Sequence, residues 1–405
     1  MASWRGVKAL IHDAVDATTH LVGEGHASVA RNVRRVTDRI EPLAAPAEAV
    51  DTVRGLATEG VLATIRGVNR AVEALSDVAL DAMLDAASEA AGPLIPMRSD
   101  LIGDRRLTAD AALGLVNGFI GDHLARVNPE LDLGFSLRCG DRPLSEGAPA
   151  NATGRVVVFV HGLATTEWSW CLNAEANLGA PDAHFGVMLA RDLGFTPIYA
   201  RYNTGRPVPD NGARLAAALE AALAAWPVPV DELVLVGHSM GGLVCRAACN
   251  AGARAQHAWL RPLRRVVSLG TPHQGAPLAR LSDAATAVLA TIDLPATRIL
   301  SKILDIRSAG IRDLSHGEVG DAEDAGPLLP GVAWHFLAGS LHVDPAHPVG
   351  RVIGDLLVQE PSAAGPVVHT GTFELHHARF GGLLHHQLQS HPDVYTALRH
   401  ACALG

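Results

Sequence analysis

The sequence contains few cysteines, and their number and spacing exclude a fold held together by disulfide bonds. Its 405 residues include five cysteines, which is an odd number, and no two of them form a Cys-x-x-Cys pair. Disulfide frameworks belong mainly to short secreted chains with paired cysteines. We therefore predict buried free thiols in a reducing compartment at Cys139, Cys171, Cys245, Cys249 and Cys402.

Other features that the sequence lacks exclude further classes of protein. Positive charge is not in excess, because the formal net charge is -9 and the sequence pI is about 6.1, so nucleic acid is not the expected partner. No apolar run approaches the roughly 18 residues of a membrane span. His12 and Asp13 interrupt the apolar core that a signal peptide would need. The His-Glu-x-x-His spacing of zinc hydrolases is missing as well. We expect a cytoplasmic protein with no metal and no cofactor.

Apolar residues, in contrast, make up 48% of the chain, which is enough for a large core. Over residues 1–125 they recur at helical spacing, for example at Val7, Leu10, Ile11 and Ala14 and again at Leu62, Ile65, Val68 and Val72. This pattern predicts an N-terminal α-helical segment that packs on the rest of the chain or on itself. Peripheral contact of these amphipathic helices with a lipid surface is the alternative, although their polar faces mix both signs of charge.

From residue 126 to residue 405, short apolar runs alternate with helical stretches. The predicted strands are Arg155–Val160, Thr196–Ala200, Leu233–Val236, Val266–Leu269 and Val332–Ala338. Buried strands that alternate with helices predict a mostly parallel sheet with helices on both faces. Residues 276–330 are too many for an ordinary connection between two such strands. We expect them to form a helical cap insertion over an active site.

The run Gly237-His238-Ser239-Met240-Gly241 matches the short pattern Gly-x-Ser-x-Gly. The pattern also occurs by chance, and an ordinary glycine-rich turn is the alternative. Here it follows a predicted strand and precedes an apolar helical stretch, which is the context of a nucleophilic serine on a sharp strand-to-helix turn. Glycines on either side avoid a clash across such a turn. The context favours Ser239 as a nucleophile.

Two more motifs accompany this turn. The strand over residues 155–160 ends in His161-Gly162-Leu163, and the strand over residues 266–269 ends in Gly270-Thr271-Pro272-His273-Gln274-Gly275. With the serine motif they resemble the bacterial lipase and esterase branch of the α/β-hydrolase superfamily, near triacylglycerol lipases and the GPI inositol-deacylase-like hydrolases. The resemblance covers about residues 126–405 and implies the α/β-hydrolase fold, but this fold supports many chemistries.

The resemblance also implies where the groups around the serine come from. An oxyanion hole would use the backbone N–H groups of Leu163 and Met240. His161 would organise the loop by hydrogen bonding and would not act as the base. The residues expected to contact substrate are His161, Gly162, Trp168, His238 and His273.

The catalytic acid and base should follow the last predicted strand in the order Ser, Asp, His. Gly354-Asp355-Leu356-Leu357-Val358 resembles the run that carries the acid in these lipases, so Asp355 is favoured over Asp344. The base is expected about six residues before the pair His391-Pro392, which favours His385 over the adjacent His386. An apolar residue usually follows this histidine in the family, and His386 departs from that pattern.

These assignments predict a serine carboxylesterase or lipase whose small-molecule ester or lipid substrate has an apolar acyl chain. An acyltransferase or an amidase would use the same three residues. A third hypothesis is that the chain is not chiefly an enzyme. It would then be a lipid- or granule-associated binding protein that acts through its N-terminal helices.

Overall fold

The structure is a computed structural model of the chain, and it describes the region around the predicted catalytic residues. The described residues are 97–101, 105–127, 129–275, 308–316, 328–344, 355, 358, 360–363 and 374–403. They all belong to one of two compact units, the one formed by residues 81–285 and 306–405. The helices predicted over residues 1–96 and most of the predicted cap, residues 276–307 and 317–327, lie outside the described residues. The predicted boundary at residue 125 therefore stays a prediction.

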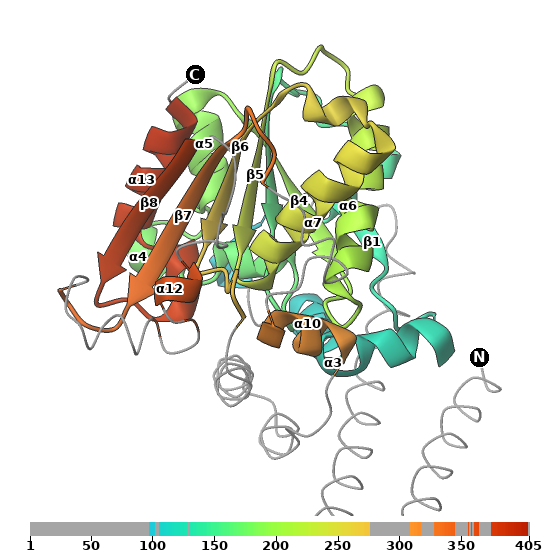
Figure 1. Ribbon diagram of the computed structural model, residues 1–405, viewed down its shortest axis with the longest axis horizontal. Coiled ribbons are helices and arrows are strands. Elements are labelled where there is room, and N and C mark those ends of the chain that lie inside the picture. Colours follow the sequence, from blue (N-terminus) through green and yellow to red (C-terminus); the bar gives the residue numbers. More distant parts are fainter. Residues whose placement is uncertain are drawn as a thin grey trace, which may run out of the picture. The chain divides into compact units, whose positions relative to one another are not determined.

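An eight-stranded sheet lies at the centre of this unit (Figure 1). The strands lie side by side in the order β2-β1-β4-β3-β5-β6-β7-β8. From β4 to β8 in this order all neighbours are parallel, and β1 runs antiparallel to both β4 and β2. The bounds are Phe135–Cys139 (β1), Arg142–Pro143 (β2), Arg155–Val160 (β3), Thr196–Tyr202 (β4), Glu232–His238 (β5), Leu263–Leu269 (β6), Ala333–Ser340 (β7) and Glu374–Gly381 (β8). The predicted, mostly parallel sheet is confirmed.

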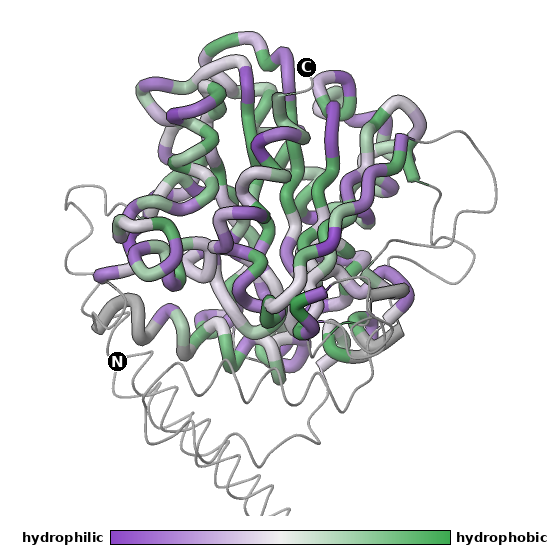
Figure 2. Tube along the Cα trace, turned by 90° about the vertical axis from the view of Figure 1, so that its left-hand side faces the viewer, coloured by the Kyte–Doolittle hydropathy of each residue, from purple (hydrophilic) through white to green (hydrophobic). Residues whose placement is uncertain are grey.

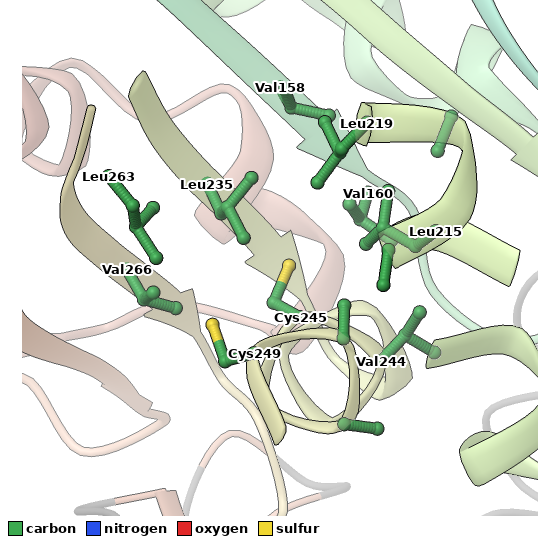
Figure 3. Close-up of a cluster of buried hydrophobic side chains, with 14 of the residues drawn as sticks. Val158, Val160, Leu215, Leu219, Leu235, Val244, Cys245, Cys249, Leu263 and Val266 are labelled. Atoms are coloured by element: carbon green, nitrogen blue, oxygen red, sulfur yellow. The ribbon is translucent and has the colours of Figure 1, made fainter. Parts of the chain in front are cut away.

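Helices cover both faces of the sheet, and the strands are apolar on both sides as a result. Val158 and Val160 of β3 point to the face covered by α6 (Val208–Ala224) and α7 (Met240–Ala255), where they share a core with Leu215 (Figure 3). Val157 and Phe159 point to the opposite face, toward α5 (Phe185–Leu193) and α13 (Pro392–Ala403). Successive side chains of a strand alternate between faces, and Figure 2 shows the strands as the apolar centre of the fold.

The remaining helices lie mostly near the ends of the strands. They are α3 (Arg105–Val127), α4 (Ala174–Leu178), α10 (Ala309–His316), α12 (Glu360–Ala363) and the 3-10 turns η2 (Ser99–Leu101), η3 (Leu144–Glu146), η4 (Glu167–Cys171), η5 (Ala258–Leu260) and η6 (His385–Gln389). Figure 1 shows α3, α10 and α12 at the end of the sheet toward which the arrows of β7 and β8 point. α3 is kinked at Ile120, whose φ is -129° and ψ 17°. No helix among the described residues is long and apolar enough to cross a membrane.

The edge strand β8 was not among the predicted strands. Its run Glu374-Leu375-His376-His377-Ala378-Arg379-Phe380-Gly381 contains few apolar residues, and half of its positions are exposed. An edge strand with one open side needs no continuous apolar run, so the pattern that marks the buried strands is missing. Two of the histidines that follow the last predicted strand, His376 and His377, therefore lie on a strand and not on a loop.

All five cysteines are free thiols, and four of them are buried. Cys245 and Cys249 lie on α7 and point into the core between this helix and the sheet (Figure 3). Burial raises the pKa of Cys249 to about 12 and also raises the pKa of Cys245. Buried thiols of this kind pack as small apolar side chains.

Candidate active site

Ser239 occupies the turn between β5 and α7 and has an unusual backbone conformation. Its φ is 54° and its ψ is -125°, a region that side-chain-bearing residues rarely adopt. Its N–H donates to the carbonyl oxygen of Leu269 at 2.9 Å, which fixes the turn against the end of β6. The two glycines of the motif are needed for packing: a Cβ on Gly237 would collide with Gly242, and one on Gly241 would collide with the carbonyl oxygen of Val160. The turn therefore requires the glycines that the motif provides.

Asp355 and His385 form a buried hydrogen-bonded pair. The Nδ1 of His385 lies 2.7 Å from Oδ2 of Asp355, and the side chains are 7% and 1% exposed, respectively. Oδ1 of Asp355 accepts the N–H of Val358 at 2.9 Å, and the N–H of His385 donates to the carbonyl oxygen of Asp355 at 3.2 Å. A carboxylate can only accept, so Nδ1 of His385 carries the proton and Nε2 keeps a lone pair. This Nε2 is buried and has no partner among the described residues.

The three side chains lie at the ends of neighbouring strands. Ser239 directly follows β5, and Asp355 lies against β7, where a Cβ on Gly339 would approach the Cβ of Asp355 to 3.1 Å. The imidazole of His385 lies over Gly270, which directly follows β6, since a Cβ there would be 3.0 Å from its Cε1. The carboxyl ends of parallel strands meet at one edge of the sheet, so the fold brings a serine, an imidazole and a carboxylate to the same place.

The rival acid and base lie elsewhere. Asp344 and His386 are both exposed. The N–H of Asp344 is bonded to Nδ1 of His342 at 3.1 Å, within its own loop. Of the two candidate acids and the two candidate bases, Asp355 and His385 are the ones that form a buried contact with each other.

The loop after β3 runs beside the serine. Gly162 gives it room, because a Cβ there would lie 3.1 Å from the Cβ of Ser239. Ala164, two residues later, has a φ of 59°, and its N–H donates to Oγ1 of Thr204 at 3.0 Å. Within the described part of the chain, no acceptor takes the N–H of Leu163 or of Met240, the first residue of α7. A helix begins with free N–H groups, and here they lie next to the serine.

His161 is fully buried at the base of this loop. Its ring stacks on Tyr202 with the centroids 4.4 Å apart, and its Nδ1 lies 2.9 Å from the carbonyl oxygen of Gly162. The hydroxyl of Tyr202 donates to the carbonyl oxygen of His161 at 2.7 Å. Burial lowers the pKa of His161 to about 3, so the ring is neutral at pH 7. These contacts fit the loop-organising role expected for His161.

The other expected substrate contacts differ in position. His238, next to the serine, is buried with its ring centroid 4.7 Å from that of His385. Trp168 is buried in the core on the α5 and α13 face. His273 packs edge-on against Phe336 at 5.1 Å, and neither of its ring nitrogens has a partner among the described residues. Contact of Trp168 and His273 with substrate stays a prediction.

Sequence reasoning missed two residues of the site, Tyr202 and Thr204, which fix the loop after β3. Gly270, the first residue of the motif after β6, makes room for His385. The Asn203-Thr204-Gly205 turn after β4 was visible in the sequence, but nothing in its composition showed which loop it contacts. No group of three or more potential metal ligands occurs among the residues that the structure describes.

A family model described as the PGAP1-like alpha/beta domain matches residues 216–297, which include β5, Ser239, α7 and β6. The sheet order and the covering helices are those of the α/β-hydrolase fold, and over residues 216–297 the chain is similar to the PGAP1-like alpha/beta domain. Ser239 lies after β5 and before α7, both of which fall within the matched residues.

Several solved structures are distantly similar to this chain. A lipase-esterase related protein from Clostridium acetobutylicum is 11% identical, with a TM-score of 0.38, over 63% of this chain and 96% of that one. A carboxylesterase from Bacillus subtilis is 12% identical, with a TM-score of 0.37, over 63% and 86%. A thermophilic esterase from Thermogutta terrifontis is 16% identical, with a TM-score of 0.36, over 62% and 90%. No curated protein matches the sequence significantly.

Proposed function

We propose that the protein is a serine hydrolase that cleaves carboxylic esters through an acyl-enzyme on Ser239. The observation that supports this proposal most is the buried pair of Asp355 and His385, which leaves a bare imidazole nitrogen at the strand ends where Ser239 stands. A serine hydroxyl is a weak nucleophile until a neighbouring base accepts its proton. The pair provides such a base in the required tautomer.

In the first half of the proposed reaction, Oγ of Ser239 attacks the ester carbonyl carbon while Nε2 of His385 takes the hydroxyl proton. The carbonyl oxygen becomes an oxyanion, which the N–H groups of Leu163 and Met240 stabilise by hydrogen bonds. The Asp355 carboxylate stabilises the imidazolium that forms. The C–O bond to the leaving alcohol then breaks, and the alcohol takes its proton from Nε2.

In the second half, water attacks the acyl-enzyme carbonyl and gives a proton to Nε2 of His385. Collapse of the second oxyanion breaks the bond to Oγ of Ser239, which takes the proton back and releases a carboxylic acid. An ester with an apolar acyl chain is the proposed substrate class. The apolar side chains of Leu163, on the loop beside the serine, and of Met240, which follows the serine in the chain, are consistent with it.

A serine-reactive fluorophosphonate probe tests the nucleophile directly. We expect the wild-type protein to be labelled and Ser239→Ala to remain unlabelled. His385→Ala should be labelled at least about 1,000-fold more slowly, since it removes the base. His386→Ala is the matched control, because it removes the adjacent exposed imidazole and should be labelled at the wild-type rate. Equal labelling of wild type and Ser239→Ala would reject the proposal.

Product analysis separates hydrolysis from the related reactions. Aryl esters of graded chain length should be cleaved faster as the acyl chain lengthens, up to a maximum set by the site. An added alcohol would divert acyl groups into a new ester in an acyltransferase, and an anilide of the same acid would be cleaved in an amidase. If the full chain floats with lipid vesicles but cleaves no ester and takes no probe, the lipid-binding alternative is correct instead.

A further inference from the structure

One face of α3 carries glycines where it meets the loop after β3. Gly114, Gly118 and Gly121 are spaced by four and three residues and so lie on one side of the helix. A Cβ on Gly114 would lie 2.9 Å from Cγ2 of Thr166, and one on Gly118 would lie 2.6 Å from the Cβ of Ala164. One on Gly121 would collide with the side chain of Asn203. The backbone of α3 therefore packs directly against residues of this loop and of the turn after β4. No room is left at these glycines for a methyl group.

The contact at Gly118 falls at a sensitive place in the loop. A Cβ there would also lie 2.7 Å from Cα and 3.0 Å from N of Ala164. The Ala164 nitrogen belongs to the peptide whose carbonyl is that of Leu163, and Ala164 has a φ of 59°. A push on Ala164 therefore tilts the peptide next to the Leu163 N–H, the first of the two proposed oxyanion donors.

A buried ionic network connects the same helix to the same loop. Arg201 of β4 donates to both carboxylate oxygens of Glu167, at 2.9 and 2.8 Å, and to Asp110 of α3 at 2.6 Å. The Glu167 side chain is fully buried, and that of Arg201 is 13% exposed. Buried charged groups lose their hydration, and they are stable only if hydrogen bonds and ion pairs replace it. This requirement fixes the relative positions of the three side chains. The network holds η4, at the end of the loop, at a set distance from α3.

Amide side chains fix the helix to the neighbouring turns. Asn117 donates to the carbonyl oxygen of Leu131 at 2.8 Å and accepts the N–H of Leu133 at 3.1 Å. Asn203 donates to the carbonyl oxygen of Gly121 at 2.8 Å. The kink at Ile120 lies between the two glycines that make the closest approaches. α3 is therefore attached on both sides of the point where it presses on Ala164.

We propose that α3 is a positioning element of the oxyanion loop, and that Gly118 is the residue whose missing side chain sets the place of the Leu163 N–H. The inference rests on the proposed esterase function. An oxyanion donor must lie about 2.7–3.1 Å from the developing charge, and an error of about 1 Å in such a position costs about 100-fold in rate. A methyl group at residue 118 would impose a displacement of this order.

The test compares two buried helical glycines. Gly118→Ala should lower kcat, and the rate constant of fluorophosphonate labelling, by about 10- to 100-fold, with KM changed by no more than about twofold. Gly252→Ala is the matched control. It lies near the far end of α7, where a Cβ would be 2.8 Å from Cζ2 of Trp259. We expect it to lower the thermal unfolding midpoint as much as Gly118→Ala does and to leave kcat within about twofold, because it crowds the core without touching the loop.

A complementary change provides the rescue. Ala164→Gly removes the Cβ that meets the new methyl group and suits a residue whose φ is 59°. In the double variant Gly118→Ala/Ala164→Gly, kcat should recover at least about threefold relative to Gly118→Ala alone, since coupled neighbours show non-additive effects. If Gly118 affected only stability, the double variant could not regain kcat without also regaining its unfolding midpoint.

The outcomes separate the two proposals. If the wild-type protein is not labelled at Ser239, the proposed function fails and the inference fails with it. If the wild type is labelled and Gly118→Ala reacts at the wild-type rate, or if both glycine variants lose kcat equally, the positioning role alone is overturned. A kcat loss confined to Gly118→Ala, with recovery in the double variant, supports it.

Discussion

His238 donates from Nε2 to the backbone carbonyl oxygen of His385 over 3.1 Å. A carbonyl oxygen can only accept, so this bond fixes the proton on Nε2 of His238. Burial, and then the neighbouring His385, lower the pKa of His238 well below its usual range, so the ring stays neutral at pH 7. The residue before the proposed nucleophile is thereby bonded to the main chain of the proposed base. Its neutral ring thus links the chain segment of the nucleophile to that of the base.

This bond predicts different effects for two substitutions of His238. His238→Ala removes the donor and should lower kcat by about tenfold, because the base is held less well. His238→Gln places an amide N–H near the former Nε2 position and should keep kcat within about threefold of wild type. Steady-state kinetics on an aryl ester checks both. Equal losses in the two variants would show that the ring, and not the hydrogen bond, matters.

The two candidate acids predict a second contrast. Asp355→Asn puts an amide opposite Nδ1 of His385 and favours the wrong imidazole tautomer, so kcat should fall by about 10,000-fold with little change in fold. Asp344→Asn changes an exposed carboxylate and should leave kcat unchanged. Circular dichroism confirms folding in each case. A larger loss in Asp344→Asn would reverse the assignment of the acid.

The backbone strain at Ser239 predicts a gain in stability. Glycine adopts positive φ values without a Cβ clash, so Ser239→Gly should raise the free energy of unfolding by about 1 kcal/mol while abolishing activity. Ser239→Ala keeps the Cβ at the same φ of 54° and should show no such gain. Urea titrations of the three proteins measure the difference. If both variants gain equally, the hydroxyl and not the backbone conformation is the source.

Buried histidines predict how stability depends on pH. Burial is the main cause that lowers the pKa of His161 to about 3 and the pKa values of His184 and His335 to about 4. In the unfolded chain a histidine titrates near 6.5. Between about pH 6.5 and pH 4 the unfolded chain thus binds protons that the folded protein does not, so stability must fall as the pH is lowered through this range.

Urea titrations at pH 7, 6 and 5 check this slope, and one substitution isolates a single histidine. His184→Asn removes one titrating ring and should reduce the slope by up to about 1.4 kcal/mol per pH unit. His123→Asn, on the exposed side of α3, is the control for the histidine-to-asparagine change itself at pH 7. An unchanged slope in His184→Asn would mean that this ring is not held neutral by the fold.

Prediction from the sequence worked best where the local composition of a segment is compatible with only one kind of structure. The run Arg155–Val160 is apolar at every position after the first because β3 is buried on both faces, and its predicted bounds coincide with the observed ones. The turn at Ser239 was predictable for a similar reason, since two glycines and a serine between a strand and a helix have few other uses. Local composition was sufficient in both cases.

Contacts between distant parts of the chain were beyond the same reasoning. Nothing in the stretch Arg105–Val127 shows that Gly118 meets Ala164. The helical pattern of residues 1–125 predicted packing on the rest of the chain or on itself, but it named no contact. Nor does the sequence show that Trp168, which follows the loop closely in the chain, packs in the core on the α5 and α13 face. Spacing along a chain predicts neighbours on one element and not the partners of a loop.

The thiols of Cys245 and Cys249 give the protein an internal reporter of local opening. They lie on the helix that starts at Ser239 and are fully enclosed beneath it, so an alkylating reagent can reach them only when this layer separates from the sheet. The rate at which these thiols are alkylated therefore measures how often α7, which follows the serine, opens away from the sheet. No dye or engineered label is required.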